Sequence, residues 1–144
     1  MTEVSITVEY SDISADVYAE TGFMGKKKGD MDTIAATGDD KAVLDGYFMD
    51  AAQELAAAVS RVGSLTAVSA TSATFGLSLP GNWREAVRPA LERAMRKFMA
   101  AFMVYQWFNL AKDDKMRYYA ETAEGLQKNI NKYLYERSHP KRSS

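Results

Sequence analysis

The side chains that most often perform catalysis are scarce in this sequence. It contains no cysteine, and its single histidine, His139, stands beside Pro140 near the C-terminal end. A nucleophile activated by histidine is therefore not expected, and neither is a zinc site, which usually takes several histidine or cysteine ligands. We predict a protein without catalytic residues, bound metal or cofactor.

Carboxylates remain as candidates for acid–base chemistry, and they occur close together as Asp12, Asp16 and Glu20, as Asp39 and Asp40, and as Asp113 and Asp114. The first group falls on one face if residues 12–20 are helical. The two adjacent pairs stand at predicted helix starts, where the helix dipole favours negative charge. Catalytic carboxylates must face each other across a pocket, which spacing along the chain does not establish. We therefore predict capping roles for these side chains.

The segment from residue 22 to residue 38 is rich in glycine and contains the run Lys26, Lys27 and Lys28. A phosphate-binding loop would need its glycines to lead into a Lys-Ser or Lys-Thr pair at the start of a helix, and that pair is missing. We predict a mobile loop at 22–38. Two interpretations stay open: a solvated loop, or an arm that becomes ordered on a partner.

Length and composition are those of one folded domain. The chain has 144 residues, of which 47% are hydrophobic and 26% charged, and its formal net charge is −1. This charge gives no general electrostatic reason to expect nucleic-acid binding. The N-terminus alternates apolar and polar residues and lacks the blocks of a signal peptide, so we expect a cytoplasmic origin.

A long and heavily apolar helix is predicted at residues 82–112. Between Phe98 and Leu110 apolar and aromatic side chains recur at helical spacing, so the helix must be buried on several sides. The apolar run is well short of the roughly 20 residues that cross a bilayer. Pro89 would remove a helical hydrogen bond, so we expect a kink there or a short helix at 83–88 before the main one. Either other helices of the chain or a second subunit must cover this helix.

The remaining elements follow from periodicity and capping signals. Residues 4–10 alternate as a half-buried strand, and a short helix follows at 12–20. Two further long helices are predicted at 39–62 and 114–137. Residues 64–80 are rich in Ser, Thr and β-branched side chains and carry no charge, which indicates a β-hairpin. The predicted fold class is therefore α+β and mainly helical, a bundle of three long helices with a short N-terminal strand and helix and a β-hairpin.

Three segments are candidate sites of partner binding. The hairpin must pack on the helices, pair with the N-terminal strand or pair with another chain, because an isolated hairpin is marginal in water. Beyond the predicted domain at residues 1–137, the basic tail at 138–144 is a frayed terminus or a docking peptide, with nucleic-acid contact as a third option. The candidate residues are Phe75 and Leu77 in the hairpin, Lys26, Lys27 and Lys28 in the loop, and Arg137, His139, Pro140, Lys141 and Arg142 at the C-terminal end.

The order of these elements resembles that of small proteins from tailed bacteriophages and prophages, in particular those of Bacteroides-type gut bacteria. The resemblance is carried by Leu79, Pro80, Asn82, Tyr105, Trp107, Phe108, Arg137, Pro140 and Arg142. The layout is also similar to that of head–tail connector adaptors, which combine a helical bundle with a hairpin, a mobile loop and a C-terminal segment that docks on the portal. The resemblance implies a ring-forming virion component without catalysis.

Our first hypothesis is a non-catalytic structural protein that forms homo-oligomers, with a ring as one form, and docks on a portal or another virion protein. It would act in the bacterial cytoplasm during assembly and then in the virion, without binding a membrane or a specific nucleic-acid sequence. The alternative is a small-molecule or lipid-binding domain with a pocket of methionine and aromatic side chains between the long helices. A third hypothesis is a membrane-active protein that uses residues 98–110.

Overall fold

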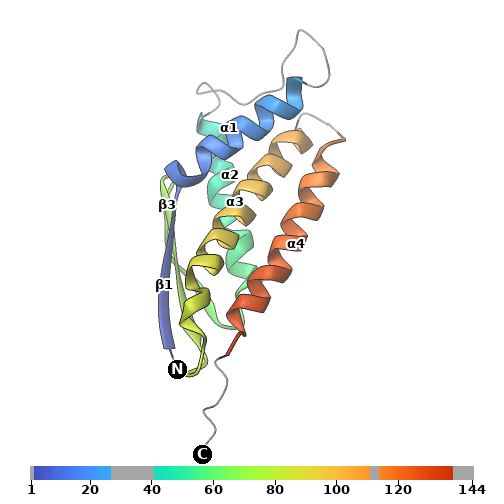
Figure 1. The fold of residues 1–144 in the computed structure, drawn as a ribbon. Helices are drawn as coiled ribbons and strands as arrows, with labels where there is room; N and C mark the ends of the chain where they lie inside the picture. The colour runs from blue at the N-terminus through green and yellow to red at the C-terminus, as the bar shows by residue number, and fades with distance from the viewer. Residues whose placement is uncertain (1, 27–40, 111–113, 138–144) are drawn as a thin grey trace, which may run out of the picture.

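A computed structural model of the chain describes residues 2–26, 41–110 and 114–137. Within these residues it contains a three-stranded antiparallel sheet, four α-helices and a short 3-10 helix (Figure 1). In chain order the elements are β1 (Thr2–Glu9), α1 (Tyr10–Lys26), α2 (Lys41–Ala58), β2 (Gly63–Val68), β3 (Ser72–Leu79), η2 (Glu85–Val87), α3 (Arg88–Leu110) and α4 (Met116–Leu134). The predicted α+β class, mainly helical, is confirmed.

The sheet has the strand order β1-β3-β2, so the N-terminal strand pairs with the second strand of the hairpin. Alternation decides which face is buried, because successive side chains of a strand point to opposite faces. Val4 opposite Leu77 and Ile6 opposite Phe75 are buried, whereas serine and threonine side chains dominate the other face. The hairpin therefore both pairs with the N-terminal strand and packs on the helices.

α3 is the central element, and α1, α2 and α4 all pack against it (Figure 1). Its methionines Met95, Met99 and Met103 are fully buried, as expected for a helix covered on several sides. Pro89 lies in the first turn of α3, where a missing N–H costs no helical hydrogen bond. Of the two outcomes expected around Pro89, the structure has the short preceding helix, in the form of η2.

The C-terminal end of α4 and the residues that follow it contact the segment before α3. The indole N–H of Trp83 donates a hydrogen bond of 2.8 Å to the carbonyl oxygen of Tyr133, and Arg84 forms a salt bridge of 2.8 Å with Glu136. The helix start predicted at residue 82 is therefore wrong, because Trp83 forms an isolated β-bridge with Arg137. α4 runs antiparallel to α3 as predicted, and its buried side chains are Tyr119, Ala123, Ile130 and Leu134.

The predicted bundle of three long helices is not confirmed. The predicted short helix is α1, which extends to Lys26 instead of ending near Glu20, so it is a fourth long helix, and it packs on α3. Residues 22–26 of the predicted mobile loop are thus helical. Residues 27–38 of that loop and the tail at 138–144 lie outside the described residues.

Candidate functional site

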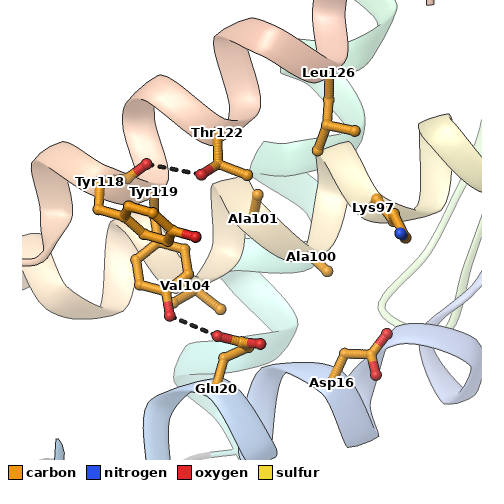
Figure 2. Close-up of a pocket in the computed structure, with 10 residues that line it drawn as sticks. All are labelled: Asp16, Glu20, Lys97, Ala100, Ala101, Val104, Tyr118, Tyr119, Thr122 and Leu126. Atoms are coloured by element: carbon orange, nitrogen blue, oxygen red, sulfur yellow. Dashed lines mark hydrogen bonds between the residues drawn. The ribbon is translucent and has the colours of Figure 1, made fainter. Parts of the chain in front are cut away.

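A groove runs along α3 beside α4, and Figure 2 shows the half of it that α1 also lines. It joins two depressions of about 410 Å³ and 540 Å³, which share Lys97 and Leu126. We name it the alanine groove. It is lined by Asp16 and Glu20 of α1, by Pro89, Ala90, Arg93, Ala94, Lys97, Ala100, Ala101 and Val104 of α3, and by Tyr118, Tyr119, Thr122, Leu126, Asn129 and Tyr133 of α4.

Small side chains form the floor of the alanine groove. Ala90, Ala94 and Ala101 follow one another at steps of four and seven residues, which places them on one face of α3. The long side chains that α3 adds to the lining, Arg93 and Lys97, are exposed. A helix face with a floor of this kind allows a second helix to approach to an axis distance of about 8–10 Å.

Tyr119 connects the two walls of the groove. Its hydroxyl donates a hydrogen bond of 2.6 Å to Oε2 of Glu20 on α1 (Figure 2), and its ring stacks on Phe108 with the centroids 5.6 Å apart. Burial, the hydrogen bond to Glu20 and the charge of Glu20 raise the pKa of Tyr119 above its ordinary value of 10.0. Tyr119 therefore stays protonated at neutral pH and acts as a structural link between α4 and α1.

The rim of the alanine groove carries opposite charges at its two ends. Asp16 and Glu20 stand at the α1 end, Arg93 stands towards the start of α3, and Lys97 lies between them. In the described part of the chain no group of three or more His, Cys, Asp or Glu side chains is placed to hold a metal ion. Exposed single charges around an apolar floor suit contact with a protein surface.

A further depression, of about 230 Å³, lies on the other side of α4, between α4 and α2. Its lining residues are Glu54 of α2, Phe98, Phe102 and Tyr105 of α3, and Ala120, Ala123, Glu124 and Gln127 of α4. We name it the aromatic groove, because rings of α3 form its floor. The two grooves thus share the same two helices, α3 and α4, but use different faces of each.

The outer face of α2 carries apolar side chains that are exposed. Val43 and Met49 are 41% and 40% exposed, and a Cβ added to Gly46 would meet no atom within 4 Å. We name the exposed residues Ala42, Val43, Gly46, Met49, Gln53 and Ala57 the α2 strip. The inner face of α2 is buried and apolar, and the exposed carboxylates of Asp50 and Glu54 lie beside the α2 strip on the outer face.

Two of the predicted partner contacts are contradicted by their burial. Phe75 and Leu77 are 0% exposed and face the helices from β3, so their side chains cannot reach a partner. The alternation predicted for this strand is correct. Helices of the same chain cover the apolar side of this strand. Alternation along a strand does not tell whether the same chain or another subunit buries the apolar side.

The other predicted contact residues lie at or beyond the ends of the described segments. Arg137 is exposed and pairs with Trp83, and Lys26 is the last residue of α1. Arg137 lines neither the alanine groove nor the aromatic groove. The remaining predicted contact residues lie outside the described residues: Lys27, Lys28, His139, Pro140, Lys141 and Arg142.

The alanine groove was not predicted from the sequence, and the aromatic groove was predicted only as part of a methionine and aromatic pocket between the long helices. The spacing of Ala90, Ala94 and Ala101 could have revealed the small face of α3. Glu54 and Glu124 belong to different helices, so only the packing of α2 and α4 on α3 makes them neighbours. Among the carboxylates considered for chemistry, Asp16 and Glu20 line the alanine groove, whereas Asp39, Asp40 and Asp113 lie outside the described residues.

Comparison with family models, with curated proteins and with solved structures found no match for this chain. None of the described helices is both long and apolar enough to cross a membrane. What the chain binds must therefore be inferred from the geometry of the two grooves and of the α2 strip.

Proposed function

We propose that this chain is a non-catalytic structural protein that assembles with copies of itself. In the assembly the α2 strip of one copy lies in the alanine groove of the next. The observation that carries the proposal is the match in length and chemistry between these two surfaces. They lie on different sides of the molecule, because α2 is behind α3 when the groove faces the viewer (Figure 2).

The two surfaces have the same length. The alanine groove follows α3 from Pro89 to Val104, and the α2 strip runs from Ala42 to Ala57, fifteen residue steps in each case. At about 1.5 Å per residue each spans about 22 Å, which is about four helical turns. Alanine and glycine on both surfaces allow the close approach of helix axes that good packing requires.

The charges of the two surfaces are complementary. Between residues 42 and 58 α2 carries Asp45, Asp50 and Glu54 and no basic residue. The groove presents Arg93 and Lys97 along one part of its rim. Because its other end is acidic, the groove favours an arrangement in which the carboxylates of α2 lie near these two cations.

The proposed contact joins two different surfaces of identical chains, and this determines which assemblies can form. Each copy then offers one groove and one strip, and such head-to-tail contacts produce closed rings or open filaments. The narrower proposal is the adaptor of a tailed-phage head–tail connector, which assembles in the bacterial cytoplasm, enters the virion and docks on a portal-like partner. The order of elements along the chain supports it, with a hairpin before the central helix and a basic tail at the end.

A matched pair of glycine substitutions tests the proposed assembly. Gly46 lies in the α2 strip and Gly125 in α4 outside both grooves, and at both positions a Cβ would meet no atom within 4 Å. Gly46→Arg and Gly125→Arg should therefore both fold, each stabilising its helix by up to about 1 kcal/mol. Only Gly46→Arg should abolish the rise of solution mass with protein concentration, measured by light scattering.

Two outcomes would contradict the proposal. One is a wild-type chain that stays monomeric at every concentration tested. The other is an assembly that tolerates Gly46→Arg as well as it tolerates Gly125→Arg, because the α2 strip would then lie outside the contact.

The alternative function, a small-molecule or lipid pocket, keeps one observation in its favour. Met95, Met99 and Met103 are fully buried and line neither groove, so a pocket that uses these methionines is not supported. The aromatic part of that hypothesis corresponds to the aromatic groove, where Phe102 and Tyr105 are half-buried.

A further inference from the structure

Three rings in a row along α3 form the floor of the aromatic groove. Phe98 and Phe102 are nearly parallel, at 13° with their centroids 6.3 Å apart, and Tyr105 is tilted by 47° against Phe102 at 5.8 Å. Phe98 is buried, whereas Phe102 and Tyr105 keep part of their surface exposed. The groove therefore offers aromatic surface to a ligand.

Two carboxylates stand beside these rings. Glu54 reaches the groove from α2 and Glu124 from α4, and both residues are exposed. None of the lining residues is cationic, and among the residues that the structure describes neither carboxylate forms an ion pair. The groove thus combines an aromatic floor with negative charge that the described chain does not balance.

We infer that the aromatic groove binds a small organic ammonium ion, with a quaternary or alkylated nitrogen. Such a cation is attracted by ring faces within about 6 Å of their centroids. Its alkyl groups pack on Phe102 and Ala123, and Glu54 and Glu124 balance its charge. The volume of about 230 Å³ is below the range of drug-sized pockets, so the ligand has few heavy atoms.

Other classes of ligand would use fewer of these features. A calcium ion needs about six or more oxygen ligands, far beyond two exposed carboxylates on separate helices. An anion would be repelled by Glu54 and Glu124, and an uncharged apolar ligand would leave their charge unbalanced. The inference does not require the proposed assembly, but the two proposals share Glu54, whose carboxylate is among those that α2 would bring near Arg93 and Lys97. Glu124 belongs to neither the α2 strip nor the alanine groove.

Choline and its uncharged carbon isostere, 3,3-dimethylbutan-1-ol, form a matched pair of probes for this site. We expect choline chloride, titrated into the full chain at constant ionic strength, to produce saturable NMR shifts at Phe102, Tyr105 and Ala123. The isostere has the same shape without the charge and should bind at least about tenfold more weakly. Equal binding of both probes, or no saturable shift up to about 100 mM choline, would overturn the inference.

Substitutions in the groove separate the contribution of the rings from that of the charges. Phe102→Leu keeps an apolar side chain and should weaken choline binding about two- to fivefold, the size of an exposed cation–π interaction. Glu124→Gln changes only an exposed charge, so it should weaken binding without affecting the fold. Glu121→Gln makes the same change at an exposed position of α4 that does not line the groove, and should bind as the wild type does. If Glu124→Gln and Glu121→Gln have the same effect, the proposed site is wrong.

Discussion

α3 supplies the floor of both grooves. On one side of α4 this floor is made of alanines, and on the other side it is made of aromatic rings. The alanine groove has a rim of mixed charge, with Asp16 at one end and Arg93 at the other. The aromatic groove is about half as large as either part of the alanine groove, and the only charges in its described lining are those of Glu54 and Glu124. Both grooves are lined by α3 and α4. α1 completes part of the alanine groove, and α2 completes the aromatic groove.

The size of the side chains along one face of a helix decides which contacts that face can make. Small residues let another helix approach closely over several turns, and they supply shape without a specific chemical group. Aromatic residues hold a neighbouring helix away but present π faces that attract cations. We therefore propose two kinds of contact for α3, one with a protein surface and one with a small cation.

Truncation of the aromatic floor should have the largest effect on stability. Phe98 is 3% exposed and part of the core, so Phe98→Ala should lower the free energy of unfolding by about 3–5 kcal/mol. Phe102→Ala should cost less, because Phe102 is half-buried. Urea denaturation measures both values. If the two substitutions cost the same, the aromatic row is not graded from core to groove as the structure describes.

Removal of the hydroxyl that joins the walls of the alanine groove should have an intermediate effect. Tyr119→Phe keeps the stacking on Phe108 but loses the hydrogen bond to Glu20, which should cost about 1 kcal/mol at neutral pH. The wild-type advantage should depend on pH, because the pKa of Tyr119 is raised in the folded state above its ordinary value of 10.0. The stabilisation is therefore complete below pH 10 and is lost as the pH rises towards the folded pKa.

Denaturation of the wild type and of Tyr119→Phe from about pH 8 to pH 11 measures this dependence. The difference in unfolding free energy should be constant up to about pH 10 and should then shrink. A difference that stays constant over the whole range would show that the hydroxyl of Tyr119 does not make the bond to Glu20.

Reversal of one rim charge should have the smallest effect, and only on assembly. Lys97→Glu places a negative charge opposite the acidic α2 and should weaken association about two- to fivefold at low salt, with little change at high salt. Lys128→Glu makes the same change at an exposed position of α4 outside both grooves and serves as the control. Light scattering over a concentration series measures the association of both variants. Equal weakening by Lys97→Glu and Lys128→Glu would show that the rim charges of the groove do not contribute to assembly.

The elements with strong periodicity were predictable from the sequence. Val4, Ile6 and Val8 alternate as they do in β1, and Leu44, Phe48 and Leu55 follow the helical spacing that α2 buries. The extent of α1 was not predictable, because Gly22 suggests a helix end where the helix in fact continues to Lys26.

The grooves could be predicted only in part, because each depends on how separate helices pack. Spacing reveals a small face of α3 but does not tell whether α1 or α4 covers it. The same limit explains the error at Phe75 and Leu77, whose alternation indicates a buried face without indicating which chain buries it.

We propose that α2 of one copy lies in the alanine groove of another, and site-specific cross-linking tests this contact most directly. Because the chain has no cysteine, Gly46→Cys and Lys97→Cys can be prepared as separate proteins, mixed and treated with a short bismaleimide. We predict a cross-link between copies that joins the two introduced thiols, identified by mass spectrometry, and none when Gly125→Cys replaces Gly46→Cys. Equal yields from the two mixtures, or no cross-link from the first, would contradict the claim.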